Sequence, residues 1–80
     1  MQTTYFVAVP FDRDPEGDLK AGEAHEFPSA NDAERQAGAL ALNHTGAVAF
    51  SRTGDPTLGE FRDAIMLAQF GEVDLDALSV

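Results

Sequence analysis

Two short segments of the chain are apolar at nearly every position, and they are the strongest indications of β-structure. Residues 4–11 (TYFVAVPF) and 47–51 (AVAFS) combine aromatic and β-branched side chains with alanine. Such residues pack well on a pleated surface, and a strand that is apolar on both faces is typical of the middle of a sheet. Pro10 lacks a backbone N–H and therefore limits pairing near the end of the first segment. We predict two central strands.

The polar residues after the first segment predict a turn followed by a second strand. Residues 12–18 (DRDPEGD) combine aspartate, proline and glycine, the residue types that form turns. Residues 19–27 then alternate weakly between apolar and polar side chains and carry several charges, which is typical of an edge strand. The pattern predicts a β-hairpin over residues 4–27.

Apolar residues recur at helical spacing in the next part of the chain, which is its clearest element. Ser29 is a favourable N-cap, with Asp32 three residues later at the positive end of the helix dipole. The predicted helix covers about residues 30–43, and its small side chains let it lie close to a sheet. Gly38 costs about 1 kcal/mol relative to alanine, so we predict that a neighbouring backbone approaches closely there. The apolar stripe of this helix consists of Ala33, Ala37, Leu40 and Ala41.

The segment before the C-terminal tail is ambiguous between strand and helix. Residues 64–70 (AIMLAQF) are largely apolar, and the glycines and proline in residues 52–63 indicate a long hairpin loop ahead of them. A buried strand fits a short apolar run better than a long helix does. We predict a strand, with a helix over residues 56–70 as the alternative. The acidic tail, about residues 72–80, is expected to be loosely ordered.

These elements follow one another in the order ββαββ and predict an α+β fold of two layers. A right-handed crossover from the second strand to the third gives a four-stranded antiparallel sheet of order 2-1-3-4, with the helix on one face. If the last segment is helical, the order becomes ββαβα.

One helix covers only one face of such a sheet, so the other face needs the C-terminal tail or a second copy of the chain to cover it. Exposed apolar patches of this kind usually mark interfaces. The candidate interface residues are Tyr5, Val7, Val9 and Phe11, or else Phe6 and Ala8 with partners from residues 47–51.

Composition restricts the functions open to this domain. The 80 residues include 14 acidic and 5 basic side chains, a net charge of −9, so direct binding to nucleic acid or to an anionic membrane is not expected. The chain has no cysteine and therefore neither disulfides nor thiolate chemistry. No apolar stretch is long enough to span a membrane, and the N-terminal residues lack the pattern of a secretory signal. We expect one small cytoplasmic domain over residues 1–80.

Residues 46–73 resemble the C-terminal half of a family of small uncharacterised bacterial proteins. The shared segments are AVAFSRTGDP and, after it, GEFRDAIMLAQFG, in which the family pattern is GE, an aromatic residue, and then DA, LA and FG at the same spacing. The strand–turn–strand–helix order before these segments is similar as well. The resemblance implies a stand-alone domain and a strand at residues 64–70, and it implies no activity.

Residues 12–23 match part of the pattern of an EF-hand calcium loop. Oxygen-bearing side chains occupy its first, third, fifth and twelfth positions, namely Asp12, Asp14, Glu16 and Glu23. Pro15 inside the loop, and a strand where a helix should precede it, count against this interpretation. Turns rich in aspartate are also common in acidic chains, because aspartate binds its own backbone. We therefore predict no metal site and no cofactor.

A second candidate site lies in the glycine-containing loop at residues 51–63. Arginine side chains and the backbone N–H groups of such a loop can bind a carboxylate or a phosphate group. The alternative is that the arginines pair with neighbouring acids across a hairpin, at a small net energy. The candidate ligand-binding residues are Arg52, Thr53, Gly54 and Arg62.

No combination of residues predicts catalysis. His25 and His44 have no third ligand nearby in the sequence, and so small a chain rarely offers a catalytic cleft. We expect a non-catalytic interaction module whose partner is another protein or a second copy of the chain, as a homodimer. One alternative is a regulatory domain that binds a small anionic ligand at residues 51–63. Another is an acidic mimic of nucleic acid that binds a basic partner.

Overall fold

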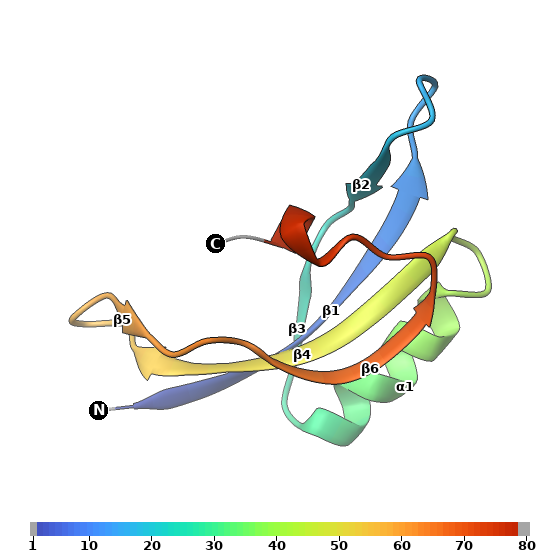
Figure 1. Cartoon of the computed structure of the whole chain (residues 1–80). Helices are drawn as coiled ribbons and strands as arrows, with labels where there is room; N and C mark the ends of the chain where they lie inside the picture. Colours follow the sequence, from blue (N-terminus) through green and yellow to red (C-terminus); the bar gives the residue numbers. More distant parts are fainter. Residues whose placement is uncertain (1, 79–80) are drawn as a thin grey trace.

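The computed structural model describes residues 2–78, and one curled sheet forms most of them (Figure 1). Mostly antiparallel strands form a half-barrel on which a single helix packs, so the α+β class predicted from the sequence is confirmed. The elements are β1 (Thr3–Arg13), β2 (Leu19–Ala21), β3 (His25–Phe27), α1 (Ala30–Leu40), β4 (Gly46–Asp55), β5 (Glu60–Phe61), β6 (Ile65–Gly71) and the 3-10 helix η1 (Leu75–Leu78). Among residues 2–78, no helix has the length and apolar character needed to cross a membrane.

Strands β1 and β4 form the centre of the sheet. They run antiparallel from the pair Thr3–Gly54 to the pair Phe11–Gly46. β2 and β3 pair with the outer side of β1, while β5 and β6 pair with the outer side of β4. This arrangement corresponds to the predicted strand order, with two differences: the strand predicted at residues 19–27 is divided into β2 and β3, and the short strand β5 forms within the predicted loop at residues 52–63.

The predicted strand at residues 19–27 is divided opposite Pro10. The carbonyl oxygen of Pro10 accepts a hydrogen bond from the N–H of Gly22 at 2.7 Å. In an antiparallel ladder the N–H and C=O of one residue point to the same neighbouring strand. The position where Pro10 lacks an N–H therefore also faces the edge formed by β2 and β3. The ladder therefore stops after β2 and resumes only at β3.

Residues 65–71 form a strand, and the alternative helix over residues 56–70 is wrong. β6 pairs with β4 from Gly46–Gly71 to Ser51–Ile65, with one irregularity in register between Ala49 and Phe50. Ahead of β6, β5 closes a tight hairpin with the end of β4. The glycines and the proline of this hairpin disfavour a helix, because each is costly inside one.

Helix α1 begins as predicted and ends earlier than predicted. The Ser29 side chain accepts a hydrogen bond from the N–H of Asp32 at 3.1 Å, which confirms the N-cap. The helix ends at Leu40 rather than near residue 43. The N–H of Asn43 donates to the carbonyl oxygen of Leu40 at 3.0 Å. This tighter turn satisfies one of the last carbonyl groups and leads the chain into β4.

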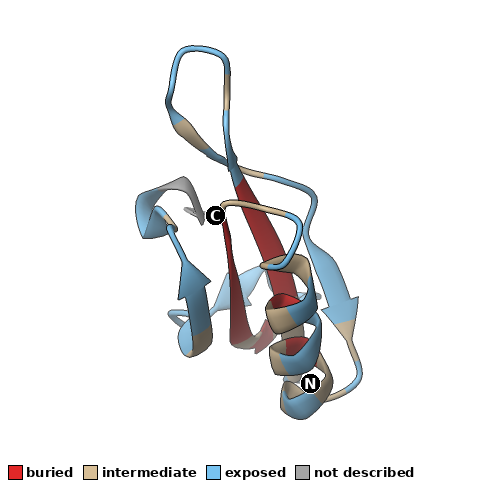
Figure 2. Ribbon diagram, turned by 90° about the vertical axis from the view of Figure 1, so that its right-hand side faces the viewer, coloured by how far each residue is buried: buried red, intermediate tan, exposed pale blue. Residues whose placement is uncertain are grey.

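Small side chains fill the layer between α1 and the sheet. Figure 2 shows the buried residues on the central strands and on the side of α1 that faces them. The fully buried residues of this helix-side core are Ala8, Ala33, Ala37, Ala47 and Ala49. Alanine side chains are short, so the helix lies close to the sheet, as the apolar stripe predicted.

Larger side chains form a second core on the opposite, concave face of the sheet. Phe11 and Val48 are the largest fully buried side chains among the described residues. Val9 and Phe50 complete this concave core, and Val73 packs against it from the segment after β6. The curl of the sheet thus buries the side chains of its concave face, which no α-helix of residues 2–78 covers.

Residues 79–80 of the predicted acidic tail (residues 72–80) lie outside the described residues. Its described part follows the sheet: Glu72 forms an ion pair of 2.9 Å with Arg13, and Val73 packs against the concave core. Both partners of the ion pair are exposed, so it contributes little by itself. η1 then lies against β2. The described part of the tail therefore covers one end of the concave face.

Replacing Gly38 by alanine should stabilise the domain. A Cβ atom at this position would meet the ring of Phe70 at 3.6 Å, which is an ordinary van der Waals contact. The predicted close approach of a backbone to Gly38 is therefore wrong. Since alanine is favoured over glycine inside a helix by about 1 kcal/mol, we expect Gly38→Ala to raise the free energy of unfolding, in urea denaturation, by up to about that amount.

Gly46→Ala provides the matched control for this experiment. A Cβ atom at Gly46 would overlap the backbone of Glu72, so the same exchange should lower the free energy of unfolding by more than about 1 kcal/mol. Destabilisation by Gly38→Ala would contradict the packing of α1 against β6.

Candidate functional site

The pairing of β1 with β4 lines the concave face with alternate residues of both strands. The opposed pairs on this face are Tyr5–Arg52, Val7–Phe50, Val9–Val48 and Phe11–Gly46. The central part of the face is therefore apolar except for the tyrosine hydroxyl and the arginine guanidinium, which lie at the same end.

One end of the concave face is closed within the chain. Phe11 is 0% exposed and Val9 is 2% exposed, because β2 and Val73 pack against them. The predicted interface residues are therefore divided: Val9 and Phe11 belong to the concave core, whereas Tyr5 and Val7 are half-buried at the other end.

The other end of the concave face is an open groove of about 500 Å³. The residues that line it are Tyr5, Val7, Ala24, Phe50, Arg52 and Phe61. Ala24 comes from the connection between β2 and β3 and Phe61 from β5, so both edges of the sheet contribute walls to this groove. Its volume lies within the range of sites for small molecules.

Arg52 is the one charged residue of this lining. Its guanidinium carbon lies 5.5 Å from the centre of the Phe61 ring, a cation–π contact, and that ring lies 6.1 Å from the ring of Tyr5. The Nε atom of Arg52 is buried without a hydrogen-bond partner, and no described residue accepts a hydrogen bond from its guanidinium. A buried donor without a partner costs about 1–3 kcal/mol. The groove therefore contains a cation that no described carboxylate neutralises.

The other predicted ligand-binding residues do not join Arg52. Thr53 follows it in β4 and lies on the opposite face, where its Oγ1 is 2.8 Å from Oγ1 of Thr4. Gly54 and Arg62 line a separate hollow of about 250 Å³ beside the β4–β5 hairpin. Two acidic residues line that hollow as well, which makes it unfavourable for an anion. Strand alternation thus places Thr53 on the face opposite Arg52, although a loop would have allowed the two to lie together.

Three residues of the groove were absent from the predicted site. Phe61 is the single aromatic residue in the polar residues 52–63, and a large apolar side chain in such a stretch is a signal that could have identified it. Phe50 lies in the predicted strand at residues 47–51, from which partners for an alternative interface set are drawn, but it is not named as a ligand-binding residue. Ala24 gives no signal in the sequence, because only the interruption between β2 and β3 brings it to the groove.

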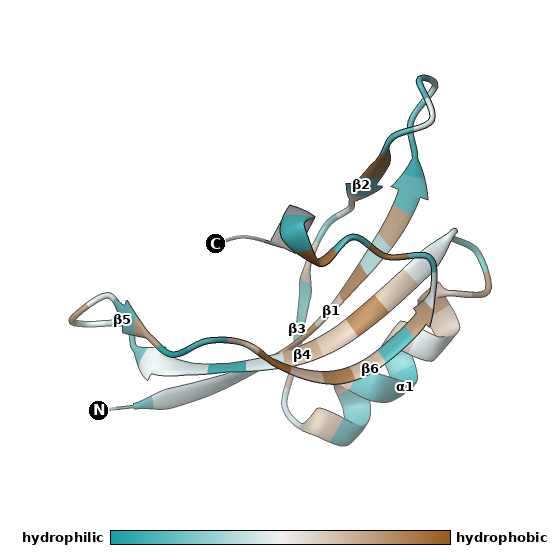
Figure 3. Ribbon diagram, viewed as in Figure 1, coloured by the Kyte–Doolittle hydropathy of each residue, from teal (hydrophilic) through white to brown (hydrophobic). Residues whose placement is uncertain are grey.

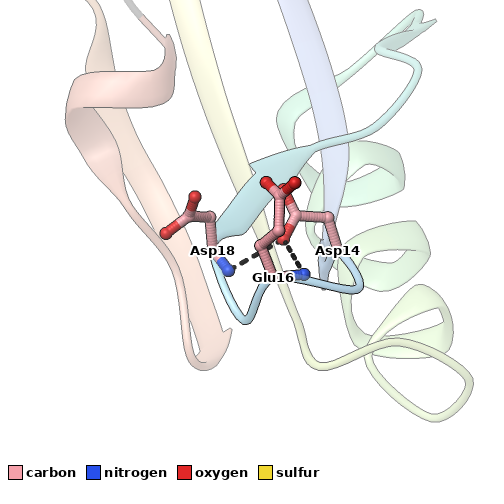
Figure 4. Close-up of side chains that lie close together, drawn as sticks. All are labelled: Asp14, Glu16 and Asp18. Carbon is pink, nitrogen blue, oxygen red and sulfur yellow. Dashed lines mark hydrogen bonds between the residues drawn. The ribbon is translucent and has the colours of Figure 1, made fainter.

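The acidic turn between β1 and β2 gathers three carboxylates. Asp14, Glu16 and Asp18 each place an oxygen atom within 4.8 Å of the others (Figure 4). Neither Asp12 nor Glu23, the first and last residues of the calcium-loop match, belongs to this group. The Asp14 carboxylate accepts hydrogen bonds from the backbone N–H groups of Glu16 and Asp18 at 3.0 and 2.9 Å, drawn as dashed lines in Figure 4. The turn is therefore organised by aspartate–backbone bonding rather than by an EF-hand set of ligands.

Asp12 instead connects β1 to the segment between α1 and β4. One of its carboxylate oxygens lies 2.5 Å from Nδ1 of His44, and the other accepts a hydrogen bond from the N–H of Thr45 at 3.2 Å. The hydrogen bond with His44 lowers the pKa of Asp12 below its ordinary value of 3.8, and the bond with Thr45 acts in the same direction. The ionised carboxylate is therefore the form that the folded chain favours.

Comparisons of the chain with protein-family models, with curated proteins and with solved structures gave no significant match. The family resemblance of residues 46–73 therefore stays a prediction. The function has to be argued from the geometry of the groove and of the sheet edges.

Asp12→Asn should remove a pH-dependent part of the stability. A carboxylate with a lowered pKa in the folded state contributes stability that is fully present above its unfolded pKa, about 3.9, and is lost as the pH falls through the folded pKa. We expect the wild type to be more stable than Asp12→Asn at neutral pH. The difference should disappear in acid, below pH 3.8, when the free energy of unfolding is measured in urea across a pH series.

Asp63→Asn is the control for the loss of one negative charge, because Asp63 makes no hydrogen bond to a described residue. We expect this variant to differ little from the wild type at any pH. A stability difference for Asp12→Asn that stays constant into acid would show that the ionised form of Asp12 is not what stabilises the fold.

Proposed function

We propose that this chain is a small interaction module that dimerises by pairing its edge strand β6 with β6 of a second copy. The observation that carries the proposal is an exposed, uncharged edge of the sheet. β6 pairs with β4 on one side, and no strand of residues 2–78 pairs with its other side. An edge of this kind presents unpaired N–H and C=O groups to which a further strand can add.

The two edges of the sheet differ in how they are protected. β2 and β3 are three residues long each and carry Lys20, His25 and Glu26. β6 extends over seven residues (IMLAQFG) without a charged residue or a proline, and its colouring in Figure 3 is mostly hydrophobic. Short strands and charged side chains are usual protections of an edge against pairing. The β6 edge lacks both.

Large apolar side chains of β6 are exposed in the single chain. Ile65 is 65% exposed, Met66 39% and Phe70 37%. Full burial of a side chain of this size contributes about 1.5–3 kcal/mol, which is substantial for a domain with so small a core. Pairing along β6 would remove part of this surface from water in both copies at once.

The net charge of −9 restricts where two copies can meet. Like charges oppose association, but β6 carries none, and its nearest charged neighbours along the chain are Asp63 and Glu72. Two copies that meet along β6 therefore bring few acidic groups together. Antiparallel pairing of a strand with its own copy is also compatible with two-fold symmetry, the commonest symmetry of protein dimers.

The sequence pattern predicts that either the C-terminal tail or a second copy covers the open sheet face. Val9 and Phe11 are buried within the single chain, so only Tyr5 and Val7 of the candidate interface are accessible there. This reduces the apolar area that a face-to-face contact could bury. We therefore place the contact at the β6 edge rather than on the face.

Ile65→Glu should convert the dimer into a monomer. The exchange places a negative charge in each copy at the shared edge, where charged residues oppose strand pairing. We expect the wild type to sediment as a dimer with a melting temperature that rises with protein concentration. The variant should sediment as a monomer, and its melting temperature should be independent of concentration.

Leu58→Glu introduces the same charge away from β6 and is the matched control. Leu58 lies in the turn between β4 and β5 and is 68% exposed, close to the exposure of Ile65. We expect this variant to remain a dimer. The proposal is wrong if the wild type is monomeric at every concentration, or if Leu58→Glu dissociates as readily as Ile65→Glu.

A further inference from the structure

The open groove on the concave face is a second binding region, separate from the β6 edge. We propose that it binds a small amphipathic carboxylate, with the charged group at Arg52 and the apolar part against the aromatic lining. The proposal is independent of the dimer, because none of the six groove residues belongs to β6.

Arg52 determines the charge of the ligand. Among the described residues it is the only charged one that lines the groove, and no described carboxylate pairs with it, although the chain contains 14 acidic residues. A guanidinium binds a carboxylate through two parallel, charge-assisted hydrogen bonds. A ligand carboxylate would therefore supply the hydrogen-bond acceptors that the described residues do not provide.

A single cation also favours a singly charged ligand over a phosphate. Phosphate sites usually combine several donors, such as a second basic side chain, a glycine-rich loop or a helix N-terminus. Arg62 lines the neighbouring hollow instead, and α1 packs on the other face of the sheet. The groove thus offers the hydrogen-bond donors of a single guanidinium, which match a single carboxylate.

The rest of the lining favours an apolar ligand body. The rings of Tyr5 and Phe61 are tilted by 44° with their centres 6.1 Å apart, and Val7 and Phe50 are paired across the two central strands. The volume of about 500 Å³ leaves room for more than a carboxyl group. A ligand with charge alone would leave this apolar surface exposed to water.

Octanoate is a suitable probe, and titration of the full chain followed by amide and side-chain NMR spectra tests the site. We expect saturable shifts that map to the groove residues. Octanol has the apolar chain without the charge and acetate has the charge without the chain, so each should bind at least about tenfold more weakly than octanoate. Equal binding of octanol and octanoate would overturn the role of Arg52, and the absence of saturable shifts in the groove would overturn the site.

Arg52→Gln should weaken octanoate binding by about tenfold or more and leave the weaker binding of octanol unchanged. Arg62→Gln removes the same charge from the neighbouring hollow and should leave octanoate binding unchanged. Equal weakening by both variants would mean that net charge, not the groove, governs binding, and the proposal would be wrong. The comparison of octanoate with octanol on the wild type does not depend on either variant folding.

The monomeric Ile65→Glu variant distinguishes this proposal from the dimer. It should bind octanoate with the affinity of the wild type, because its groove is intact. Loss of octanoate binding in this variant would show that the groove is incomplete without the second copy and would overturn the independence of the two regions.

Discussion

Helix α1 packs on β1 and β4 through alanine side chains, and the rest of the structure depends on this contact. Ala33 and Ala37 lie directly against the sheet and are fully buried. Such short side chains fill little volume, so the helix-side core does not contain the largest buried residues. Phe11 and Val48 lie on the other face and have to be shielded from water without an α-helix. The sheet curls around them, and β2 and the segment after β6 close one end.

The curl is incomplete, and both proposed binding regions result from that. At the closed end, Val73 completes the concave core. At the open end, residues 2–78 supply no further cover, and an apolar groove remains with Arg52 in its lining. A half-barrel also keeps two sheet edges that a closed barrel would pair with each other. One of these edges is short and charged, whereas β6 is long and apolar.

The distribution of charge is consistent with this division of the surface. The chain contains 14 acidic residues. None lies in β6, and among the described residues none lines the groove. Acidic side chains instead gather in turns such as residues 14–18, where the Asp14 carboxylate accepts hydrogen bonds from two backbone N–H groups. The negative charge that opposes contact between copies of the chain elsewhere is thus absent from the two regions that we propose for binding.

The sequence by itself determined the local elements, because these depend on short-range interactions. Ser29 caps α1 and the apolar runs form β1 and β4. The choice between strand and helix at residues 64–70 stayed open in the sequence, and the pairing of β6 with β4 decided it. The division of the strand predicted at residues 19–27 depends on which backbone groups face Pro10, and only the sheet reveals that. The groove depends on register: Arg52 and Thr53 are neighbours in sequence yet lie on opposite faces, while Arg52 lies opposite Tyr5. Residue types decide what can form a strand, but the long-range pairing of β1 with β4 decides which side chains share a face.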